Sequence, residues 1–323
     1  MKKSRSYFAI IILMMINCTK TETIPSSSPT TPGTIYLNEV LNIMTLNSIN
    51  RKKIDWADFK ATVLKKAEGA QTIADAYPAI EMALGLLNDH HSFYITSKGS
   101  YILNNYPNCD QAVPGIVPPS KIGYVRVPGF SGSTEEATTF ATNLQANIHQ
   151  QDAVDLKGWI VDLRENIGGN MWPMIAGIGP ILGEGIVGNF IDIDDQPIQW
   201  LYKDGASFIG SSKITSVANP YQLLVKNPKV AVLIGLRTSS SGEATAISFI
   251  GRPNTKLFGL SSTCGLSTAN AAFTLSDNAQ LFLTVSFMAD RNLKKYGVPV
   301  PPDSLVNGTT NDLTSSAINW ILK

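Results

Sequence analysis

The sequence predicts a mixed α/β protein, in which a core built on a parallel or mixed β-sheet follows a helical N-terminal part. Two largely apolar runs, residues 158–164 and 230–234, are rich in Val, Ile and Leu, which is typical of strands buried on both faces. Each run ends in a turn of small residues and leads into an apolar segment of helical composition. Ligands of such sheets bind at the carboxyl ends of the strands, so these two turns are where we expect the site.

The first residues predict an export signal. Basic residues precede an apolar stretch at 7–16 that is too short to cross a bilayer, so residues 1–18 are interpreted as a signal peptide. Cys18 ends this segment in a lipobox-like position, and we expect it to carry a lipid after cleavage; plain secretion is the alternative. Residues 19–34, rich in Ser, Thr and Pro, are expected to form a flexible linker.

Residues 35–95 are predicted to form an N-terminal helical bundle. Apolar side chains recur there at helical spacing, as in Tyr36 and Val40, and Asp55 is expected to cap a second helix. The remaining residues, 96–323, are expected to form the α/β core.

Composition and cysteine usage limit the possible functions. With 26 basic and 25 acidic residues the net charge is +1, which gives no reason to expect a nucleic-acid partner. If Cys18 carries lipid, Cys109 and Cys264 remain, and in an exported protein they form either a disulfide or two free thiols. No Cys-x-x-Cys pair and no His/Cys pattern with metal-ligand spacing occurs in the sequence, so neither a metal nor another cofactor is expected.

The turn at residues 238–243 is the strongest candidate for chemistry. It places serine hydroxyls between a strand and a helix N-terminus, where backbone amides stabilise an anion. The expected nucleophile is one of three consecutive serines, Ser239, Ser240 or Ser241. The other interpretation is that a serine only caps the helix, together with Glu243 in its first turn.

Both turns resemble the motifs of a known family. The segments GWIVDLRENIGGN, at 158–170, and TSSSGEA, at 238–244, are similar to the C-terminal processing (tail-specific) serine peptidases, which are related to the tricorn core protease. Further matches occur at 87–93, 259–268 and 297–303, in the family's order. The resemblance implies a core of the ClpP/crotonase-like type behind a helical bundle.

The chain departs from the tail-specific pattern in two ways. Leu266 occupies the position of the family's catalytic lysine, and leucine cannot accept a proton. The roughly thirty residues between His91 and Ile122 are too few for a PDZ domain, which needs about 80. The absence of the lysine, together with the presence of His91, favours the tricorn-like arrangement, in which a histidine activates the serine.

The resemblance then implies a role for each site residue. Ser240, three residues before Glu243 as in the family, is the expected nucleophile, and His91 is its expected general base. The expected oxyanion donors are the amide of Ser241 and that of Gly168 or Gly169. The candidates for the carboxylate that orients the histidine are Glu243 and Asp290.

The expected function is that of an exported serine endopeptidase, a periplasmic or cell-surface lipoprotein acting on protein or peptide substrates. Membrane attachment is expected only through a lipidated Cys18, and the oligomeric state stays open. The alternative is a non-catalytic lipoprotein that binds a ligand or peptide on the same fold. The joint presence of Ser240, Glu243, His91 and the 168–169 glycine turn argues against that alternative.

Overall fold

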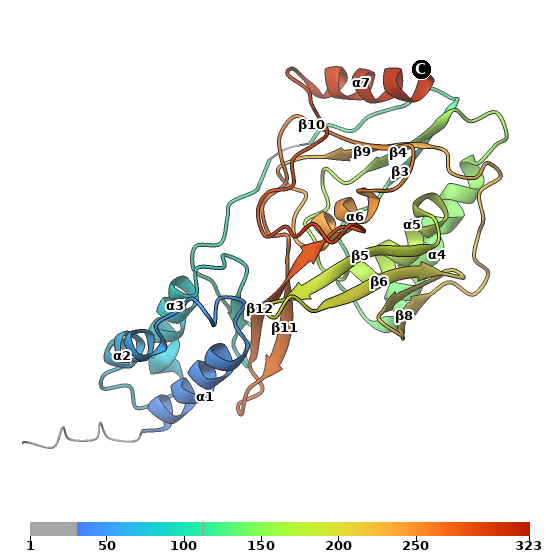
Figure 1. Cartoon of the computed structure of the whole chain (residues 1–323). Helices are drawn as coiled ribbons and strands as arrows, with labels where there is room; N and C mark the ends of the chain where they lie inside the picture. Colours follow the sequence, from blue (N-terminus) through green and yellow to red (C-terminus); the bar gives the residue numbers. More distant parts are fainter. Residues whose placement is uncertain (1–30, 112) are drawn as a thin grey trace, which may run out of the picture.

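The computed structural model describes residues 31–111 and 113–323. Within these residues the chain forms two β-sheets with helices between and beside them, next to a smaller helical part (Figure 1). The mixed α/β architecture predicted from the sequence is therefore confirmed. The predicted signal peptide and Cys18 lie outside the described residues, as does most of the predicted linker.

The first sheet consists of β3 (Ile122–Arg126), β4 (Gly158–Asp162), β9 (Lys229–Ile234), β10 (Thr255–Gly259) and β13 (Ser304–Leu305). All its neighbouring strands are parallel, in the order β13-β10-β9-β4-β3. The two predicted apolar runs coincide closely with the strands β4 and β9, which are almost wholly buried and pair Val161 with Val232. Their carboxyl ends therefore lie side by side.

Helices cover both faces of this sheet: α4 (Thr134–Gln151), α5 (Met171–Leu182), α6 (Ser241–Phe249) and α7 (Thr310–Leu322). The first three lie between the two sheets and share the main hydrophobic core with β4 and β9 (Figure 1). The last lies on the outer face, where Leu313 and Ile321 pack against Ile160. A reciprocal pair of hydrogen bonds between Ser133 and Glu136 begins α4 as a capping box.

The second sheet is antiparallel and consists of β1 (Phe93–Ile95), β2 (Tyr101–Ile102), β5 (Gly185–Asp192), β6 (Pro197–Lys203), β7 (Ala206–Ile209), β8 (Ser212–Ser216), β11 (Thr268–Thr274) and β12 (Gln280–Ala289). Its order is β2-β1-β12-β5-β6-β7-β8, with β11 also paired to β12. The long strand β12 has two neighbours on one edge: Phe282 pairs with Phe93 of β1, and Met288 pairs with Phe190 of β5. This strand therefore links the helical part to the core.

The helical part contains α1 (Pro32–Asn47), α2 (Trp56–Lys66), the 3₁₀ helix η1 (Ala74–Ala76) and α3 (Tyr77–Leu86). The predicted Asp55 cap is confirmed, because its carboxylate accepts the amides of Ala57 and Asp58. These helices pack on the outer end of the β11–β12 hairpin, which supplies Leu281 and Leu283 to their core (Figure 1). That shared core crosses the domain boundary expected near residue 95.

No helix of the described residues is both long enough and apolar enough to cross a membrane.

Candidate active site

Ser240 lies in the turn between β9 and α6, in a strained backbone conformation. Its φ of 52° and ψ of −116° fall in a region that residues with a side chain rarely adopt. A serine on a sharp strand-to-helix turn is the geometry of a nucleophile elbow, which exposes the hydroxyl above the sheet. Neighbouring contacts hold the turn: the Ser239 amide donates to the Asn166 carbonyl at 3.0 Å, and the Thr238 hydroxyl donates to the Leu163 carbonyl at 2.9 Å.

The glycine turn after β4 lies against this elbow. Gly168 and Gly169 have φ values of 100° and 106°, which favour glycine. A Cβ atom at Gly168 would lie 2.9 Å from Cβ of Ser240, so a side chain there would collide with the elbow. The Ser241 hydroxyl donates to the Gly169 carbonyl at 2.5 Å. Close approach of the two turns therefore depends on glycine.

Two backbone amides at this junction are available as oxyanion donors. The Gly168 amide donates to Asn166 Oδ1 at 3.0 Å, so it is already engaged. In the described part of the chain, neither the Gly169 amide nor the Ser241 amide donates to a protein acceptor. Both of these residues line the cavity described below, whereas Gly168 is not among its lining residues. Of the two glycines expected from the sequence, the geometry favours Gly169.

His91 is held by a tight turn that precedes β1. Oδ1 of Asp89 accepts the amides of His91, at 3.0 Å, and Ser92, at 2.8 Å. The His91 carbonyl accepts the Asn270 side-chain amide at 2.8 Å. The ring Nδ1 lies 2.8 Å from Oγ1 of Thr268, which also belongs to β11. The β11 strand has a bulge between residues 269 and 270, a feature that often re-aims side chains next to active sites.

Burial sets the protonation state of the histidine. Only 4% of His91 is exposed, and desolvation lowers its pKa to about 4, so the ring is neutral at pH 7. If Nδ1 donates to Thr268, the other ring nitrogen, Nε2, is the one that can accept a proton. The ring therefore has one hydrogen-bonded side and one side free to act as a base.

One cavity of about 880 Å³ brings the candidate residues together, with Ser240, His91, Gly169 and Ser241 in its wall. It lies between the helical part, the antiparallel sheet and the two turns. Most of its remaining wall is apolar or aromatic and includes Phe93, Tyr101, Tyr106, Trp172, Phe190 and Phe282. The cavity therefore offers a largely uncharged surface next to a serine, a histidine and two free amides.

Glu243 does not lie where a carboxylate that orients the histidine would be expected. It is fully buried beneath Ser240 and accepts that residue's amide at 3.0 Å. It also accepts hydrogen bonds from the Thr263 hydroxyl at 2.5 Å and from the amides of Gly265 and Leu266 at 3.0 and 2.7 Å. Burial raises its pKa to about 7, although these bonds act in the opposite direction. Its contacts stabilise the elbow rather than the histidine.

Asp290 likewise does not reach the histidine. Its carboxylate accepts the amides of Asn292 and Lys294 and the hydroxyl of Tyr296, so it caps the turn that follows β12. Within the described residues the His91 ring makes no hydrogen bond to any carboxylate. Thr268 takes that position instead. The sequence placed Thr268 at the end of a matching segment but contained no signal that a hydroxyl would replace an acid.

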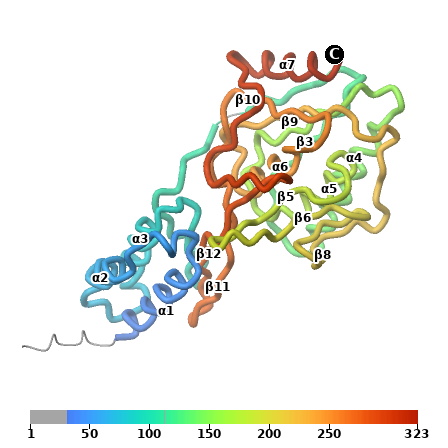
Figure 2. The backbone as a smooth tube through the Cα atoms, in the orientation of Figure 1, coloured from blue at the N-terminus to red at the C-terminus, as the bar shows by residue number. Residues whose placement is uncertain are grey.

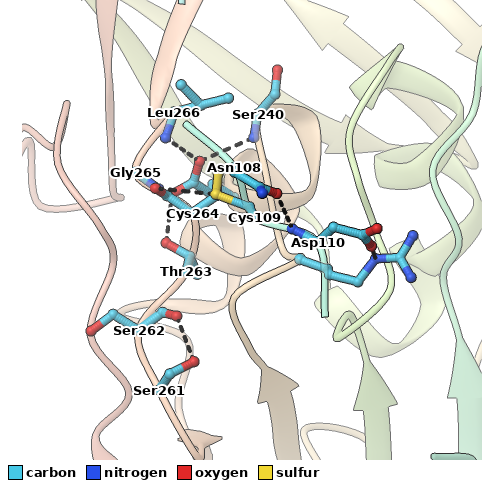
Figure 3. Close-up of a disulfide and its surroundings, with 12 residues drawn as sticks. Asn108, Cys109, Asp110, Ser240, Ser261, Ser262, Thr263, Cys264, Gly265 and Leu266 are labelled. Atoms are coloured by element: carbon cyan, nitrogen blue, oxygen red, sulfur yellow. Dashed lines mark hydrogen bonds and ion pairs between the residues drawn. A yellow bond between two sulfur atoms is a disulfide. The ribbon is translucent and has the colours of Figure 1, made fainter. Parts of the chain in front are cut away.

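A disulfide joins the irregular segment that follows β2 to the loop whose residues donate hydrogen bonds to Glu243. Cys109 and Cys264 are bonded, with a Cα–Cα distance of 5.6 Å (Figure 3). The sequence left the choice between a disulfide and free thiols open, because it fixes no distance between residues 155 positions apart. Figure 3 shows Ser240 and Leu266 beside this bond.

Comparisons with known proteins agree with this architecture. Residues 121–306 match the family model described as peptidase family S41. A nisin-resistance protein from Lactococcus lactis subsp. lactis is 30% identical over 272 residues, which cover 83% of this chain and 80% of that protein. A lipoprotein structure from Streptococcus agalactiae superposes with a TM-score of 0.71 at 23% identity, covering 91% of this chain and 97% of the other. The photosystem II D1 C-terminal processing protease superposes with a TM-score of 0.53 at 16% identity, covering 89% and 97%. The chain therefore belongs to peptidase family S41, and its fold is that of the C-terminal processing proteases.

Proposed function

We propose that this protein is an active serine peptidase in which Ser240 is the nucleophile and His91 is the general base. The observation that carries the proposal is that the strained serine, the neutral histidine and the free amides of Gly169 and Ser241 line one cavity. A non-catalytic protein would have no need to hold a serine in a strained turn beside unpaired amides.

The arrangement supports acyl transfer in two steps. Nε2 of His91 takes the proton of the Ser240 hydroxyl while the oxygen attacks the carbonyl carbon of a peptide bond. The oxyanion that forms accepts hydrogen bonds from Gly169 and Ser241, and one such donor contributes about 3 kcal/mol to lowering the barrier. The C–N bond then breaks as the imidazolium protonates the leaving amine, and water releases the acyl group by the same route in reverse.

Thr268 sets the orientation of the base without adding a charge. Its hydroxyl fixes the ring of His91 at 2.8 Å, whereas a carboxylate would also stabilise the imidazolium. The depressed pKa of His91 keeps the base free at neutral pH but makes it a weak proton acceptor. We therefore expect slower turnover than in a Ser-His-Asp triad.

The substrate is proposed to be a peptide segment with few charges. The aromatic wall suits apolar side chains, and the largely neutral lining gives little stabilisation to buried charges. Because a 30%-identical relative is named for resistance to nisin, nisin is a substrate to test beside an unstructured protein.

The arrangement along the chain is proposed to follow the sequence prediction. Residues 1–18 would direct export, a lipid on Cys18 would anchor the protein, and the residues between Cys18 and Thr31 would act as a tether. The linker predicted over 19–34 is too long at its end, because Thr31 caps α1 and the helix begins at Pro32. Residues 35–95 and 96–323 would supply the histidine and the nucleophile, respectively.

The test is hydrolysis of casein and nisin by the purified wild type and by Ser240→Ala and His91→Ala, with folding checked by circular dichroism. We expect both variants to lose at least about 10³-fold in kcat. His149→Ala is the matched control, because this exposed histidine on α4 packs against Tyr221, away from the cavity. A fluorophosphonate should label Ser240 in the wild type, which mass spectrometry of the peptides would locate.

Two results would redirect the assignment. If Ser240→Ala stays active, the nucleophile is Ser239 or Ser241. If the folded wild type cleaves neither substrate and takes up no serine reagent, the protein is a ligand- or peptide-binding lipoprotein on the same fold.

A further inference from the structure

A long irregular segment, residues 103–111 and 113–121, contributes one residue, Tyr106, to the wall of the candidate active-site cavity. The described residues of this segment contain no helix or strand, and the segment runs from the helical part to the parallel sheet (Figure 2). Ordered loops of this length without secondary structure are uncommon and are usually functional. Tyr106 in this segment lines the cavity, and its ring centroid lies 6.3 Å from that of His91.

The disulfide is the strongest contact that holds this segment near Tyr106. Cys109 follows the tyrosine by three residues and is bonded to Cys264. The neighbouring ion pair, Asp110 with Arg237 at 3.6 Å, involves an acidic side chain that is 80% exposed, so it contributes little. The next contact is the Pro114 carbonyl, which accepts Nη2 of Arg164 at 3.2 Å.

The other end of the disulfide is firmly supported. Cys264 lies between Thr263 and Gly265, which both donate to Glu243, and its own amide donates to the Thr238 carbonyl at 2.9 Å (Figure 3). The Thr263 amide also donates to the Val300 carbonyl. Breaking the disulfide would therefore release mainly the side that carries Tyr106, because the Cys264 side keeps its other bonds.

We propose that the Cys109–Cys264 disulfide is a redox-sensitive strap that keeps Tyr106 beside His91, and that Tyr106 is a positioning residue for the base. This inference rests on the proposed roles of Ser240 and His91. The aromatic ring of Tyr106 excludes water from the imidazole and limits its movement, and the covalent bond makes that cover permanent under oxidising conditions.

Reduction by a small dithiol is the step that opens the strap. A thiolate of the dithiol attacks one sulfur of the disulfide to form a mixed disulfide, and its second thiolate then closes a cyclic disulfide. The products are the two free thiols of Cys109 and Cys264, with two electrons and two protons supplied by the dithiol. Cys109 is partly exposed, so reagent can reach the bond from that side.

Loss of the cover has a specific effect on the histidine. The groups that face His91 are Asp89 from its own turn, Thr268 and Asn270 from β11, and Tyr106 from the strap. Desolvation is what depresses the pKa of His91 to about 4. When the ring becomes hydrated, that pKa rises toward the ordinary value of about 6.5, and the acid limb of kcat/KM moves to higher pH with it.

The experiment compares the oxidised wild type, the same protein treated with dithiothreitol, and the double variant C109A/C264A. Reduction and the double variant should each lower kcat by about 10- to 100-fold, with KM changed less, because the misplacement of the base outweighs the gain from its higher pKa. Both changes should also move the acid limb of the kcat/KM profile to higher pH. Tyr106→Ala should reproduce the shift without any reductant, whereas Tyr106→Phe should rescue the wild-type profile because it keeps the ring.

The double variant with dithiothreitol controls for effects of the reagent elsewhere, including on Cys18. The inference is overturned if kcat and the acid limb of the folded protein are the same before and after reduction. An independent readout is the pKa of His91 from its NMR titration, assigned by the peak lost in His91→Gln. If the oxidised protein hydrolyses nothing, the proposed function fails, and an unchanged His91 titration after reduction would still overturn the strap on its own.

Discussion

Oγ1 of Thr268 lies 2.8 Å from Nδ1 of His91, in a buried contact between residues 177 positions apart. A hydroxyl thus occupies the place where a carboxylate holds the histidine in Ser-His-Asp triads. Because threonine carries no charge, it can fix the ring and its tautomer but cannot stabilise the imidazolium as an ion pair would. Thr268 therefore orients His91 through a hydrogen bond and adds no charge to the site.

The first prediction removes this hydroxyl. Thr268→Val keeps the shape of the side chain but leaves the buried Nδ1–H without an acceptor, which costs about 1–3 kcal/mol. We expect kcat to fall by about 10- to 100-fold with KM little changed. The measurement is steady-state kinetics, together with the ¹⁵N shifts of His91 that report the tautomer.

Thr268→Ser is the matched control, because it keeps the acceptor and loses only a methyl group. It should retain most of the activity and the wild-type tautomer. An equal loss of activity in both variants would mean that packing of the methyl group, and not the hydrogen bond, matters.

The second prediction concerns stability against pH. The folded-state pKa of His91 is about 4, below its ordinary value of about 6.5, so between these values the unfolded chain binds more protons than the folded one. This group therefore makes the protein less stable as pH falls from about 6.5 to 4. His91→Gln removes that effect. Relative to the wild type, the variant should gain about 2–3 kcal/mol in free energy of unfolding between pH 7 and pH 4.

Urea unfolding at several pH values measures this difference. His149→Gln, at an exposed position on α4, is the control and should show no such gain. Parallel stability curves for the wild type and His91→Gln would contradict a buried neutral histidine.

The third prediction compares Glu243 with Glu136, because each of these glutamates follows a serine by three positions. Glu243 accepts four hydrogen bonds, two at each carboxylate oxygen, so Glu243→Gln leaves two donors facing an amide group. The expected loss in free energy of unfolding is about 2–5 kcal/mol, with weaker fluorophosphonate labelling of Ser240. Denaturant unfolding and the labelling rate are the measurements.

Glu136 forms the corresponding capping box with Ser133 at the start of α4, but it is exposed. Glu136→Gln should cost no more than about 1 kcal/mol and leave the labelling rate unchanged. A similar small cost for Glu243→Gln would show that the buried carboxylate is an ordinary helix cap.

Local pattern was enough to predict the elements that carry the site. The apolar runs that became β4 and β9 are recognisable because strands buried on both faces need unbroken apolar sequence. The turns that hold Ser240 and Gly169 follow directly from those strands, so their approach could be expected. The structure also brings His91 into the same cavity, as the family motif implied.

The partners of these residues could not be predicted in the same way. Thr268 pairs with Phe287, near the end of β12 that Asp290 follows, yet it is Thr268 that contacts His91, whereas Asp290 caps its own turn. Such contacts depend on how distant segments dock, which periodicity and composition do not encode. For the same reason, the sequence did not indicate that Tyr106 lies beside His91, and it could not decide between a disulfide and two free thiols.

The last prediction tests whether the glycine turn and the elbow must touch. Gly168 and Gly183 both have positive φ, 100° and 84°, so alanine is strained at either position by about 1–2 kcal/mol. Only at Gly168 would the new Cβ meet other atoms, 2.9 Å from Cβ of Ser240, while Gly183 has open space within 4 Å. Gly168→Ala should therefore displace the elbow from the amide of Gly169 and lower kcat by about 100-fold.

Gly183→Ala should lose similar stability and keep its activity, as measured by thermal unfolding and peptide hydrolysis. Equal activity in the two variants would mean that the oxyanion donors do not depend on this contact.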